Sequence, residues 1–377
     1  MNSAATNAPL LRILGTRGVP AAHGGFETFA ERLALHLAAQ GWRVVVYCQE
    51  EGRAPLREDV WQGVERVHIA VPGSGSRSTI NFDWRATRHA AASGGLCLTL
   101  GYNTAVFCAL LRLRGVPNLI NMDGIEWSRA KWGPAAKGWF WLNDWAGCVL
   151  GNHLVADHPE IKRHLQTRVR GSKITTIAYG ADAIGAVDDA PVRALGLQPG
   201  RYLTLIARAE PENSILEVVQ AFSRQARGLQ LAVLGHYRSD VPYQAQVKAA
   251  AGPDVVFLGA IYDKPVVQAL RAHCAAYVHG HQVGGTNPSL VEALGAGNAV
   301  IAHDNRFNRW VAGDGAAYFD GADGFASVID RLSAEPQSLA DMRAASAARF
   351  AAAFTWPAIL GHYEALLRDW LPAARGG

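Results

Sequence analysis

Short apolar runs alternate along this 377-residue chain with longer stretches in which apolar residues recur at helical spacing. The first run, LLRILG, is followed by a polar, glycine-rich loop. Apolar residues then recur every three or four positions, at Phe26, Phe29, Leu33 and Leu37. This spacing predicts an amphipathic helix, and Gly41 ends it. RVVVYC follows as a buried strand, so the first segment is a βαβ unit.

The alternation continues through two halves of the chain. The runs VERVHIA, GLCLTLG, NLINMDG and HLVADH complete a predicted doubly wound parallel sheet in residues 1–183. A less regular segment, YGADAIGAVDDAPVRALGLQPG, reads as a linker. The pattern restarts with YLTLIAR, LQLAVLG, VVFLG, AAYVHG and AVIAHD, which predicts a second α/β domain in residues 184–353. Residues 354–377 contain an amphipathic helix that we expect to pack back toward the N-terminal domain.

Length and composition agree with this division. A chain of 377 residues is too long for one ordinary core, and 49% of its residues are hydrophobic, so two domains can each bury a core. Charged residues make up 18% of the chain, which argues against disorder. The net charge of +4 is mild and no Lys/Arg run is dense, so we expect no nucleic-acid partner.

The cysteines and the N-terminus indicate the compartment. No Cys-x-x-Cys pair occurs, which argues against a disulfide framework or a zinc site and for reduced thiols. The five cysteines are Cys48, Cys97, Cys108, Cys148 and Cys274. The segment MNSAATNAPLLRILG lacks the pattern of a signal peptide, and no run approaches the ~20 apolar residues of a membrane span. We therefore expect a cytoplasmic protein, peripheral at most to the inner face of the cell membrane.

The stretch GGTNPSLVEALGAG, residues 284–297, is the first candidate for chemistry. Gly284 and Gly285 permit close approach of the backbone to a ligand. Asn287 suits an N-cap and Pro288 the first helical position, so the amides of the next turn suit a phosphate. Glu292 lies about one turn further and can accept hydrogen bonds from a ribose diol. A nucleotide site and an ordinary capped helix explain this stretch equally well.

Arg208 is the second candidate. It ends the strand in LIARAEPENS, at the edge of the sheet where an arginine can clamp a diphosphate with bidentate contacts. The alternative is an ion pair with Glu210 or Glu212.

Together these features resemble a known family. The two α/β halves, the Ala-Arg pair after YLTLI and the glycine-rich turn into LVEALGAGNAVIA resemble GT-B glycosyltransferases of retaining family 4. The stretches GTRGVPAAHGGFETFAERL, NMDGIEWSRAKW and GGTNPSLVEALGAGNAVIAHDNRFNRWV are similar to a bacterial subgroup described mostly as rhamnosyltransferases or polysaccharide-assembly enzymes. The resemblance covers nearly the whole chain. It implies a GT-B fold, in which two Rossmann-like doubly wound domains face a central cleft.

The resemblance also implies roles for individual residues. Gly24 and Gly25 let the first loop approach the donor diphosphate and the transferred sugar, and Arg208 acts catalytically by stabilising the leaving diphosphate. Glu292 matches the second glutamate of the E-x7-E motif, which holds the nucleotide ribose. The first glutamate of the motif corresponds to Gly284 in this chain. This departure leaves open which residue recognises the transferred sugar. The remaining residues of the implied donor site are Asn213, near the place of a common lysine, and Gly285, Thr286, Asn287, Pro288, Ser289 and Leu290.

Acceptor-side residues are expected at strand ends of the first half. Asp123 in NMDGIEW lies where many relatives have a histidine that faces the transferred sugar, and it is the second catalytic candidate. Its carboxylate can bond sugar hydroxyls or receive the acceptor's proton. The alternative is a helix cap, for Asp123 and still more for Glu126. Tyr102 and Asn103 lie on the same predicted rim, and with Glu126 they form the acceptor-side set.

The resemblance implies a retaining transfer in which the leaving phosphate accepts the acceptor's proton, with no metal and no cofactor. The expected partners are a nucleotide-diphosphate sugar, with dTDP-L-rhamnose as the best guess, and a saccharide or polyprenyl-linked oligosaccharide acceptor.

Five tryptophans between Trp127 and Trp145, interspersed with Arg129, Lys131 and Lys137, suit a membrane interface. The alternative is a helix packed into the N-terminal core, with some tryptophans lining a sugar groove. His279 and His281, which precede the glycine-rich loop, are expected to be structural.

Other classes of function are weaker matches. An NAD-dependent oxidoreductase needs G-x-G-x-x-G spacing, which GTRGVPAAHGG lacks, and only Glu50 near the end of the second strand favours it. A nucleotide-sugar epimerase on the same fold would act without a separate acceptor. A sugar-binding relative without activity is the third alternative, suggested by Gly284.

Overall fold

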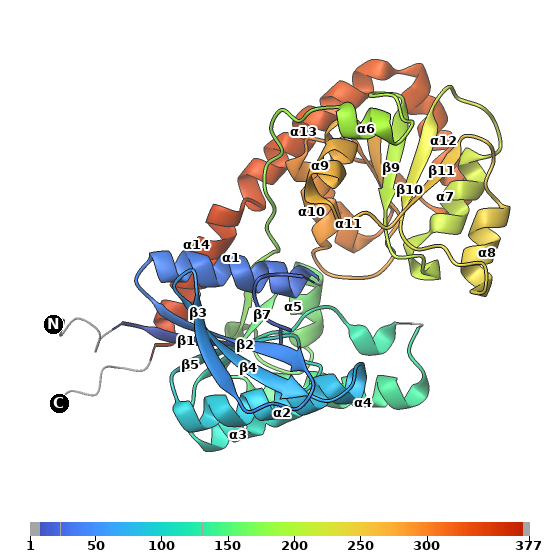
Figure 1. Cartoon of the computed structure of the whole chain (residues 1–377). Helices are drawn as coiled ribbons and strands as arrows, with labels where there is room; N and C mark the ends of the chain where they lie inside the picture. The colour runs from blue at the N-terminus through green and yellow to red at the C-terminus, as the bar shows by residue number, and fades with distance from the viewer. Residues whose placement is uncertain (1–7, 23, 130, 372–377) are drawn as a thin grey trace. The chain divides into compact units, whose positions relative to one another are not determined.

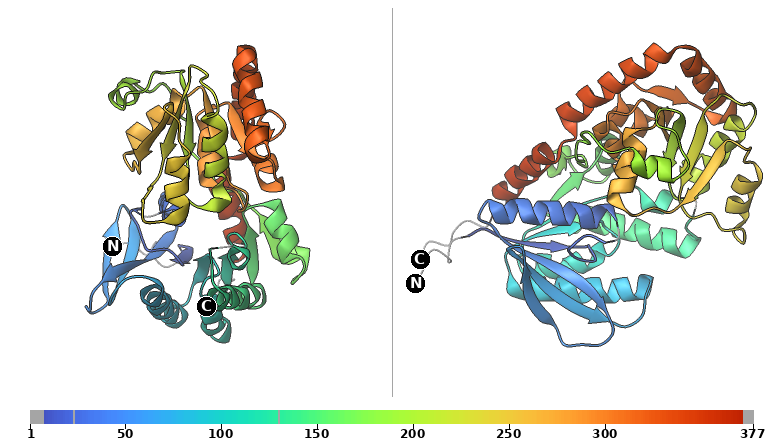
Figure 2. Two further views of the ribbon diagram at one scale, coloured as in Figure 1. Left: turned by 90° about the vertical axis from the view of Figure 1, so that its right-hand side faces the viewer. Right: turned by 45° about the horizontal axis from the view of Figure 1, so that its top comes forward.

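The computed structural model describes residues 8–22, 24–129 and 131–371. It divides the chain into two compact units. The N-terminal unit comprises residues 1–178 and 357–377, and the C-terminal unit comprises residues 179–356. Each unit is a sheet with helices on both faces (Figures 1 and 2). The predicted α/β class with two Rossmann-like domains is therefore confirmed.

The N-terminal unit contains an eight-stranded sheet in the order β3-β4-β2-β1-β5-β6-β7-β8. Its neighbouring strands are parallel, except that β3 is antiparallel to β4. The strands are β1 Leu10–Leu14, β2 Arg43–Glu51, β3 Arg57–Trp61, β4 Val64–Val71, β5 Leu96–Leu100, β6 Asn118–Asn121, β7 His153–Ala156 and β8 Ile174–Thr176.

Helix α1 lies on one face of this sheet, and α2 and α3 lie on the other (Figure 1). The helices are α1 Gly25–Ala39, α2 Ser76–Ser93, α3 Ala109–Leu113, α4 Pro134–Leu150 and α5 Pro159–Leu165, with short 3-10 turns at Ala105–Cys108, Glu126–Ser128 and Gly171–Lys173. The C-terminal helix α14, Trp356–Asp369, also packs here. The Tyr363 ring of α14 lies 4.6 Å from the Phe29 ring of α1, and its hydroxyl accepts a hydrogen bond from Asn121 at 2.8 Å.

The C-terminal unit contains a six-stranded parallel sheet in the order β11-β10-β9-β12-β13-β14. The strands are β9 Tyr202–Ile206, β10 Gln230–Leu234, β11 Val255–Gly259, β12 Ala276–His279, β13 Val300–His303 and β14 Ala317–Phe319. The helices are α6 Ala190–Ala194, α7 Ile215–Phe222, α8 Pro242–Ala249, α9 Lys264–Ala272, α10 Pro288–Gly295, α11 Arg306–Ala312, α12 Gly321–Ala334 and α13 Pro336–Ala353, with a 3-10 turn at Pro211–Asn213.

Two cores cover the two faces of this sheet. One joins α7 and α12 to the strands through buried side chains such as Val218, Phe222 and Phe325. The other joins α6 and α9 through Val192 and Leu270. Helix α6 was not predicted, since it lies in the segment read as linker. It forms because Val192 is an apolar residue that this second core buries.

Strand order reverses once in each sheet, and this positions the candidate loops. In the N-terminal unit the reversal lies between β1 and β5, and in the C-terminal unit between β9 and β12. Ligands of doubly wound sheets bind outside the carboxyl ends of the strands at such points, because the loops there diverge to opposite faces.

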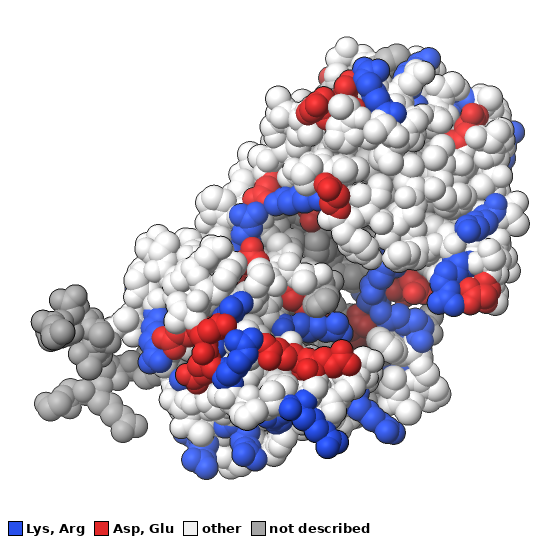
Figure 3. Space-filling view, viewed as in Figure 1, with Lys and Arg blue, Asp and Glu red and all other residues white. Residues whose placement is uncertain are grey.

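The surface and the cysteines agree with the sequence analysis. Figure 3 shows Lys/Arg and Asp/Glu side chains next to one another across the middle of the N-terminal unit, and Lys/Arg side chains alone along its lower edge. Arg43 donates a hydrogen bond of 2.8 Å to the Glu65 carboxylate. All five cysteines are buried and free. Among the described residues, no helix is long and apolar enough to cross a membrane.

Candidate functional site

Two loops of the C-terminal unit meet where its strand order reverses. The loop after β9 carries Arg208, and the loop after β12 carries Gly284. The backbone N–H of Gln282 donates to the Glu212 carbonyl at 2.9 Å, and the Gln282 side-chain amide donates to the Ser214 hydroxyl at 2.9 Å. These hydrogen bonds fix the two loops against each other.

Helix α10 begins as the sequence predicts. The Asn287 side chain accepts a hydrogen bond from the Ser289 N–H at 3.0 Å, and Pro288 is the first helical residue. The N-cap prediction is therefore confirmed. Thr286 and Leu290 on either side of this turn are buried and anchor it. The first turn of α10 presents amide groups and the positive end of the helix dipole, which suit an anion.

Gly284 has a backbone φ of 144°, a region that residues with a side chain rarely adopt. No atom lies within 4 Å of the place that a Cβ would occupy. Backbone conformation, not crowding, therefore favours glycine where the family resemblance places a glutamate. The next residue, Gly285, is partly buried.

Glu292 is held by a residue that sequence reasoning missed. Its carboxylate oxygen Oε2 lies 2.7 Å from Nη2 of Arg271 on α9. The Arg271 side chain is only 6% exposed, whereas that of Glu292 is 42% exposed. Nη2 also donates to the Ser289 hydroxyl at 3.0 Å. In the sequence, Arg271 is one polar position of an amphipathic helix, and no local signal distinguishes it.

Arg208 is exposed, and its guanidinium forms no hydrogen bond or ion pair with any residue that the structure describes. The alternative pairing with Glu210 or Glu212 is therefore not found there. The backbone carbonyl of Arg208 accepts a hydrogen bond from the Asn213 side-chain amide at 2.8 Å. Because Asn213 is only 3% exposed, its visible role is to shape this loop, and its contact with a donor stays a prediction.

His279 and His281 stack at the end of β12, with ring centroids 4.3 Å apart. His279 is buried, and burial is the main cause that holds its pKa well below the usual range of histidine. The ring is therefore neutral at pH 7. Neither of its nitrogens has a hydrogen-bond partner among the described residues, so the expected structural histidine with satisfied hydrogen bonds is not found at this position.

The N-terminal unit has a pocket of about 340 Å³ at the carboxyl ends of β1, β2 and β5. It brings together three of the predicted residues, Gly24, Gly25 and Asn103. The other lining residues are mostly polar: Gly15, Thr16, Arg17, Phe26, Glu27, Gln49, Thr79, Phe82, Asp83, Leu100, Gly101 and Thr104. The pocket therefore lies at the strand-order reversal of this unit and suits a polar ligand.

Asp83 is a second residue that the sequence did not reveal. It lies on α2, lines the pocket and accepts a hydrogen bond from the Thr104 hydroxyl at 2.8 Å. Burial raises the pKa of Asp83 to about 6, against the smaller opposing effect of Thr104. It forms no ion pair with any described residue, so this carboxyl has capacity left for a ligand hydroxyl.

Asp123 follows β6 in a strained conformation, with φ of 53°, although it is not a glycine. Its N–H donates to the Asn121 side chain at 3.0 Å. Burial, the largest cause, raises the pKa of Asp123 to about 6. Asp123 does not line the pocket that contains Asp83. Strain together with a desolvated carboxyl is typical of functional positions.

Tyr102 and Glu126 are engaged inside the structure. The Tyr102 hydroxyl accepts the N–H of Glu126 at 2.8 Å, and the Tyr102 side chain is buried. The Glu126 carboxylate pairs with Arg129 and accepts the Trp132 indole N–H at 2.9 Å. These contacts argue against direct contact with an acceptor and for a role in holding the loop that follows Asp123.

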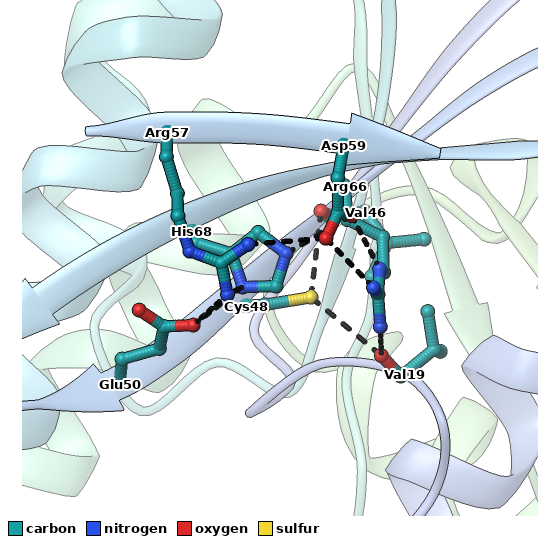
Figure 4. Close-up of polar contacts among 8 residues, drawn as sticks. All are labelled: Val19, Val46, Cys48, Glu50, Arg57, Asp59, Arg66 and His68. Atoms are coloured by element: carbon teal, nitrogen blue, oxygen red, sulfur yellow. Dashed lines mark hydrogen bonds and ion pairs between the residues drawn. The ribbon is translucent and has the colours of Figure 1, made fainter. Parts of the chain in front are cut away.

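The glycine-rich loop after β1 is anchored from β2 and β4 (Figure 4). The carbonyl of Val19 accepts a hydrogen bond from Nη1 of Arg66 at 3.1 Å, and the Cys48 thiol lies 3.9 Å from the same oxygen. Arg66 also donates two hydrogen bonds, of 2.7 and 2.8 Å, to the Asp59 carboxylate. The hydrogen bonds from Arg66 are the largest cause that holds the pKa of Asp59 well below its usual range.

Glu50, the feature that favoured an NAD enzyme, belongs to the same cluster (Figure 4). It pairs with Arg57 and lies 2.8 Å from Nδ1 of His68. Burial acts to raise the pKa of Glu50, but the contacts with Arg57 and His68 outweigh it and lower the pKa. Its carboxylate is therefore already occupied. Within the described ranges, no group of three His, Cys, Asp or Glu side chains is placed to hold a metal ion.

The five tryptophans divide into two groups. The indole N–H groups of Trp127, Trp132 and Trp139 bond to Asp144, Glu126 and the carbonyl of Asn103. Trp141 and Trp145 are 50% and 38% exposed on α4. They form an apolar stripe with Leu142 and Val149, which are also exposed.

Comparison with known proteins follows the division into two units. Residues 10–182 match a family described as a domain of unknown function, DUF1972. Residues 194–349 match the family of glycosyl transferases group 1. A phosphatidyl-myo-inositol mannosyltransferase of Mycolicibacterium smegmatis is 28% identical over 190 residues, which are 48% of this chain and 47% of the relative. That match therefore spans about half of each protein.

Solved structures resemble the chain over nearly its full length. Sucrose-phosphate synthase from Thermosynechococcus elongatus has a TM-score of 0.81 at 18% identity, over 96% of this chain and 98% of that one. The Anabaena protein HepE in complex with UDP-glucose has a TM-score of 0.75 at 13% identity, over 96% of this chain and 100% of that one. The chain therefore has the fold of a GT-B glycosyltransferase. The match to the glycosyl transferases group 1 family lies within its C-terminal unit, over residues 194–349.

Proposed function

We propose that the protein is a retaining glycosyltransferase that moves a sugar from a nucleotide diphosphate to a polysaccharide or a lipid-linked oligosaccharide. The observation that carries this proposal is that the loop with Arg208 is hydrogen-bonded to the loop that leads into the capped start of α10. Both loops lie in the stretch that matches the glycosyl transferases group 1 family. Rhamnose from dTDP-L-rhamnose is the best guess for the sugar, and it rests on the sequence resemblance.

The C-terminal unit supplies the donor contacts in this proposal. The exposed guanidinium of Arg208 receives the diphosphate and stabilises the charge that develops as it leaves. The first-turn amides of α10 add hydrogen bonds to the same anion. Glu292, whose side chain is 42% exposed, accepts hydrogen bonds from the ribose.

The N-terminal unit supplies the acceptor contacts. The pocket of about 340 Å³ that Asn103 lines receives a sugar ring of the acceptor, and Asp83 accepts hydrogen bonds from its hydroxyls. Gly24 and Gly25 line the same pocket and face the donor diphosphate and the transferred sugar in this proposal. Asp123 accepts a hydrogen bond from a sugar hydroxyl other than the reacting one and so orients the acceptor for attack. In the retaining step that the resemblance implies, the acceptor oxygen bonds to the anomeric carbon while the bond to the leaving phosphate breaks. The acceptor's proton passes to a phosphate oxygen.

Thermal unfolding with a panel of nucleotide sugars tests the proposal, since a ligand that binds the folded state raises its stability. The panel contains UDP, dTDP, GDP and ADP sugars, because the Anabaena neighbour holds UDP-glucose whereas the resemblance favours dTDP. We expect one base to raise the unfolding temperature and Arg208→Ala to abolish the rise. Transfer activity that survives in both Arg208→Ala and Glu292→Ala would show that the donor site is misplaced.

We further propose that α4 contacts a membrane surface that carries the acceptor. The exposed Trp141, Leu142, Trp145 and Val149 provide the apolar stripe, and the Arg168 guanidinium lies 5.0 Å from the Trp145 ring. Tryptophan beside a cation suits anionic headgroups.

Sedimentation with vesicles tests the membrane proposal. The double variant Trp141→Ser, Trp145→Ser should lose several-fold in binding to vesicles that contain phosphatidylglycerol. The control Tyr262→Ser, which removes an aromatic side chain that is 85% exposed in the C-terminal unit, should bind as the unchanged protein does. Equal binding by both variants would refute the contact.

A further inference from the structure

We infer that Arg271 is a positioning residue that fixes the carboxylate of Glu292 for the nucleotide ribose. This inference rests on the proposed function and deepens it, because it names the group that sets the ribose contact. Arg271 lies on α9 and belongs to none of the motifs on which the sequence reasoning relied.

The ion pair leaves half of the glutamate free. Nη2 of Arg271 lies 2.7 Å from Oε2 of Glu292, and the Glu292 side chain remains 42% exposed. The second carboxylate oxygen has no partner among the described residues, so it can accept a hydrogen bond from a ligand. The arginine is buried and cannot itself reach a ligand at the surface. The arrangement is therefore a buried cation that orients a ligand-facing carboxylate.

The same guanidinium also ties Glu292 to the start of α10. Nη2 donates to the Ser289 hydroxyl at 3.0 Å, and the Tyr277 hydroxyl lies 2.5 Å from the same oxygen. Tyr277 then donates to the carbonyl of Ile206 at 3.4 Å. Ile206 ends β9, two residues before Arg208. One chain of polar contacts thus joins the strand end that carries Arg208 to the carboxylate of Glu292.

Such a chain holds the two donor groups in a fixed relation before a nucleotide arrives. Preorganised polar groups bind better than mobile ones because no side-chain freedom is lost on binding. A glutamate without Arg271 could rotate freely, since its carboxylate has no other partner among the described residues.

The C-terminal unit offers a matched control. The side chain of Arg227 is 5% exposed, and its Nε lies 2.7 Å from Asp330, whose side chain is 46% exposed. Arg227 has the same combination of a buried guanidinium and a half-exposed carboxylate. It follows α7, however, and its partner Asp330 lies on α12, so the pair is not part of the loops after β9 and β12. Arg227→Met therefore removes a comparable ion pair without touching the candidate donor residues.

The test compares each protein's affinity for a nucleoside diphosphate with its affinity for the same nucleotide lacking the 3′-hydroxyl, by calorimetric titration. UDP, dTDP, GDP and ADP are tried first, and the one that the unchanged protein binds is used. The unchanged protein and Arg227→Met should lose roughly tenfold in affinity with the 3′-deoxy nucleotide, as expected for a hydrogen bond to a charged group. In Arg271→Met this loss should shrink to about twofold, because the carboxylate is no longer oriented.

Arg271→Lys keeps a cation but loses the planar guanidinium with its paired N–H donors. It replaces Arg271→Met in the test if Arg271→Met does not fold. It should lie between Arg271→Met and the unchanged protein. If the Arg271 variants keep the full tenfold loss, the arginine only stabilises the fold and the inference is wrong. If the unchanged protein binds none of the four nucleotides, the proposed function fails first, and the inference fails with it.

Discussion

The two units differ in the sign of the candidate side chains that have no ion-pair partner among the described residues. In the C-terminal unit the candidate carboxylate, Glu292, is paired with Arg271, whereas the candidate cation, Arg208, has no partner among the described residues. In the N-terminal unit the candidate carboxyls Asp83 and Asp123 form no ion pair within the described ranges, and burial raises the pKa of each to about 6.

This difference indicates what each unit can bind. An exposed guanidinium without a partner favours an anion, and the capped start of α10 adds to that preference. A desolvated carboxyl without a cation instead gains from hydroxyl donors and exchanges its proton near neutral pH. Under the proposed function these properties fit a nucleotide diphosphate in one unit and a sugar in the other.

The largest effect should come from Arg208→Ala. Removing a group that stabilises developing negative charge costs about 10²–10³ in turnover, and we expect a loss of that size in the rate of sugar transfer. Arg208→Lys should recover part of it. Arg238→Ala is the control, because Arg238 is exposed in the same unit but already paired with Asp240. If Arg208→Ala transfers sugar as fast as Arg238→Ala, Arg208 does not stabilise the leaving diphosphate.

The next effect should come from Asp123→Asn in the N-terminal unit. Misplacing a reactant can cost roughly 10²-fold, and we expect about that loss in kcat/KM when the group that orients the acceptor is changed. The pKa of Asp123 is raised to about 6, so its ionised form is lost as pH falls through 6. The unchanged protein should therefore lose kcat below pH 6, and the variant should not show this limb in kcat. The limb is followed in kcat because Asp83, whose pKa is also raised to about 6, is expected to act on KM. A shared acid limb in both proteins would exclude Asp123 as its origin.

Asp83→Asn should have a smaller effect, confined to binding. A hydrogen bond to a charged group is worth roughly tenfold, so KM for the acceptor should rise about tenfold while kcat changes little. Asn81→Ala changes an exposed residue of the same helix and should leave KM unaltered. A change in kcat instead of KM would place Asp83 in the reaction itself.

Most of the fold could be predicted from the sequence because central strands of covered parallel sheets are continuous apolar runs. The strands missed were β3, β8 and β14. Strand β3 lies at a sheet edge and contains Arg57, Glu58 and Asp59, so it has no apolar run. Strands β8 and β14 have only three residues each, too few to show a period.

The candidate site divides in the same way. The cap formed by Asn287 and Pro288 and the position of Arg208 at a strand end depend on a few neighbouring residues, and the sequence predicted them. Arg271 and Asp83 acquire their roles only through partners on other elements, Glu292 on α10 and Thr104 after β5. On their own helices they are ordinary polar positions, so no local pattern could have identified them.

The smallest effect tests the comparison most directly, because the same chemical change should alter stability in opposite directions. Glu292→Gln leaves the buried Arg271 without its counter-charge and should lower the free energy of unfolding by about 1–2 kcal/mol, a value reduced by the exposure of Glu292. Asp123→Asn removes a charge that burial disfavours and should raise it by about 1–2 kcal/mol at pH 8. The folded-state pKa of Asp123, about 6, lies above the ordinary value of 3.8 for an aspartate. The gain from Asp123→Asn should therefore shrink as pH falls from 6 toward 4, where the aspartate takes up its proton. Denaturant unfolding at pH 8 and pH 4.5 measures both variants. If Glu292→Gln and Asp123→Asn lower the free energy of unfolding equally at pH 8, both carboxyls have stabilising partners in the folded protein. The contrast between the two units is then wrong.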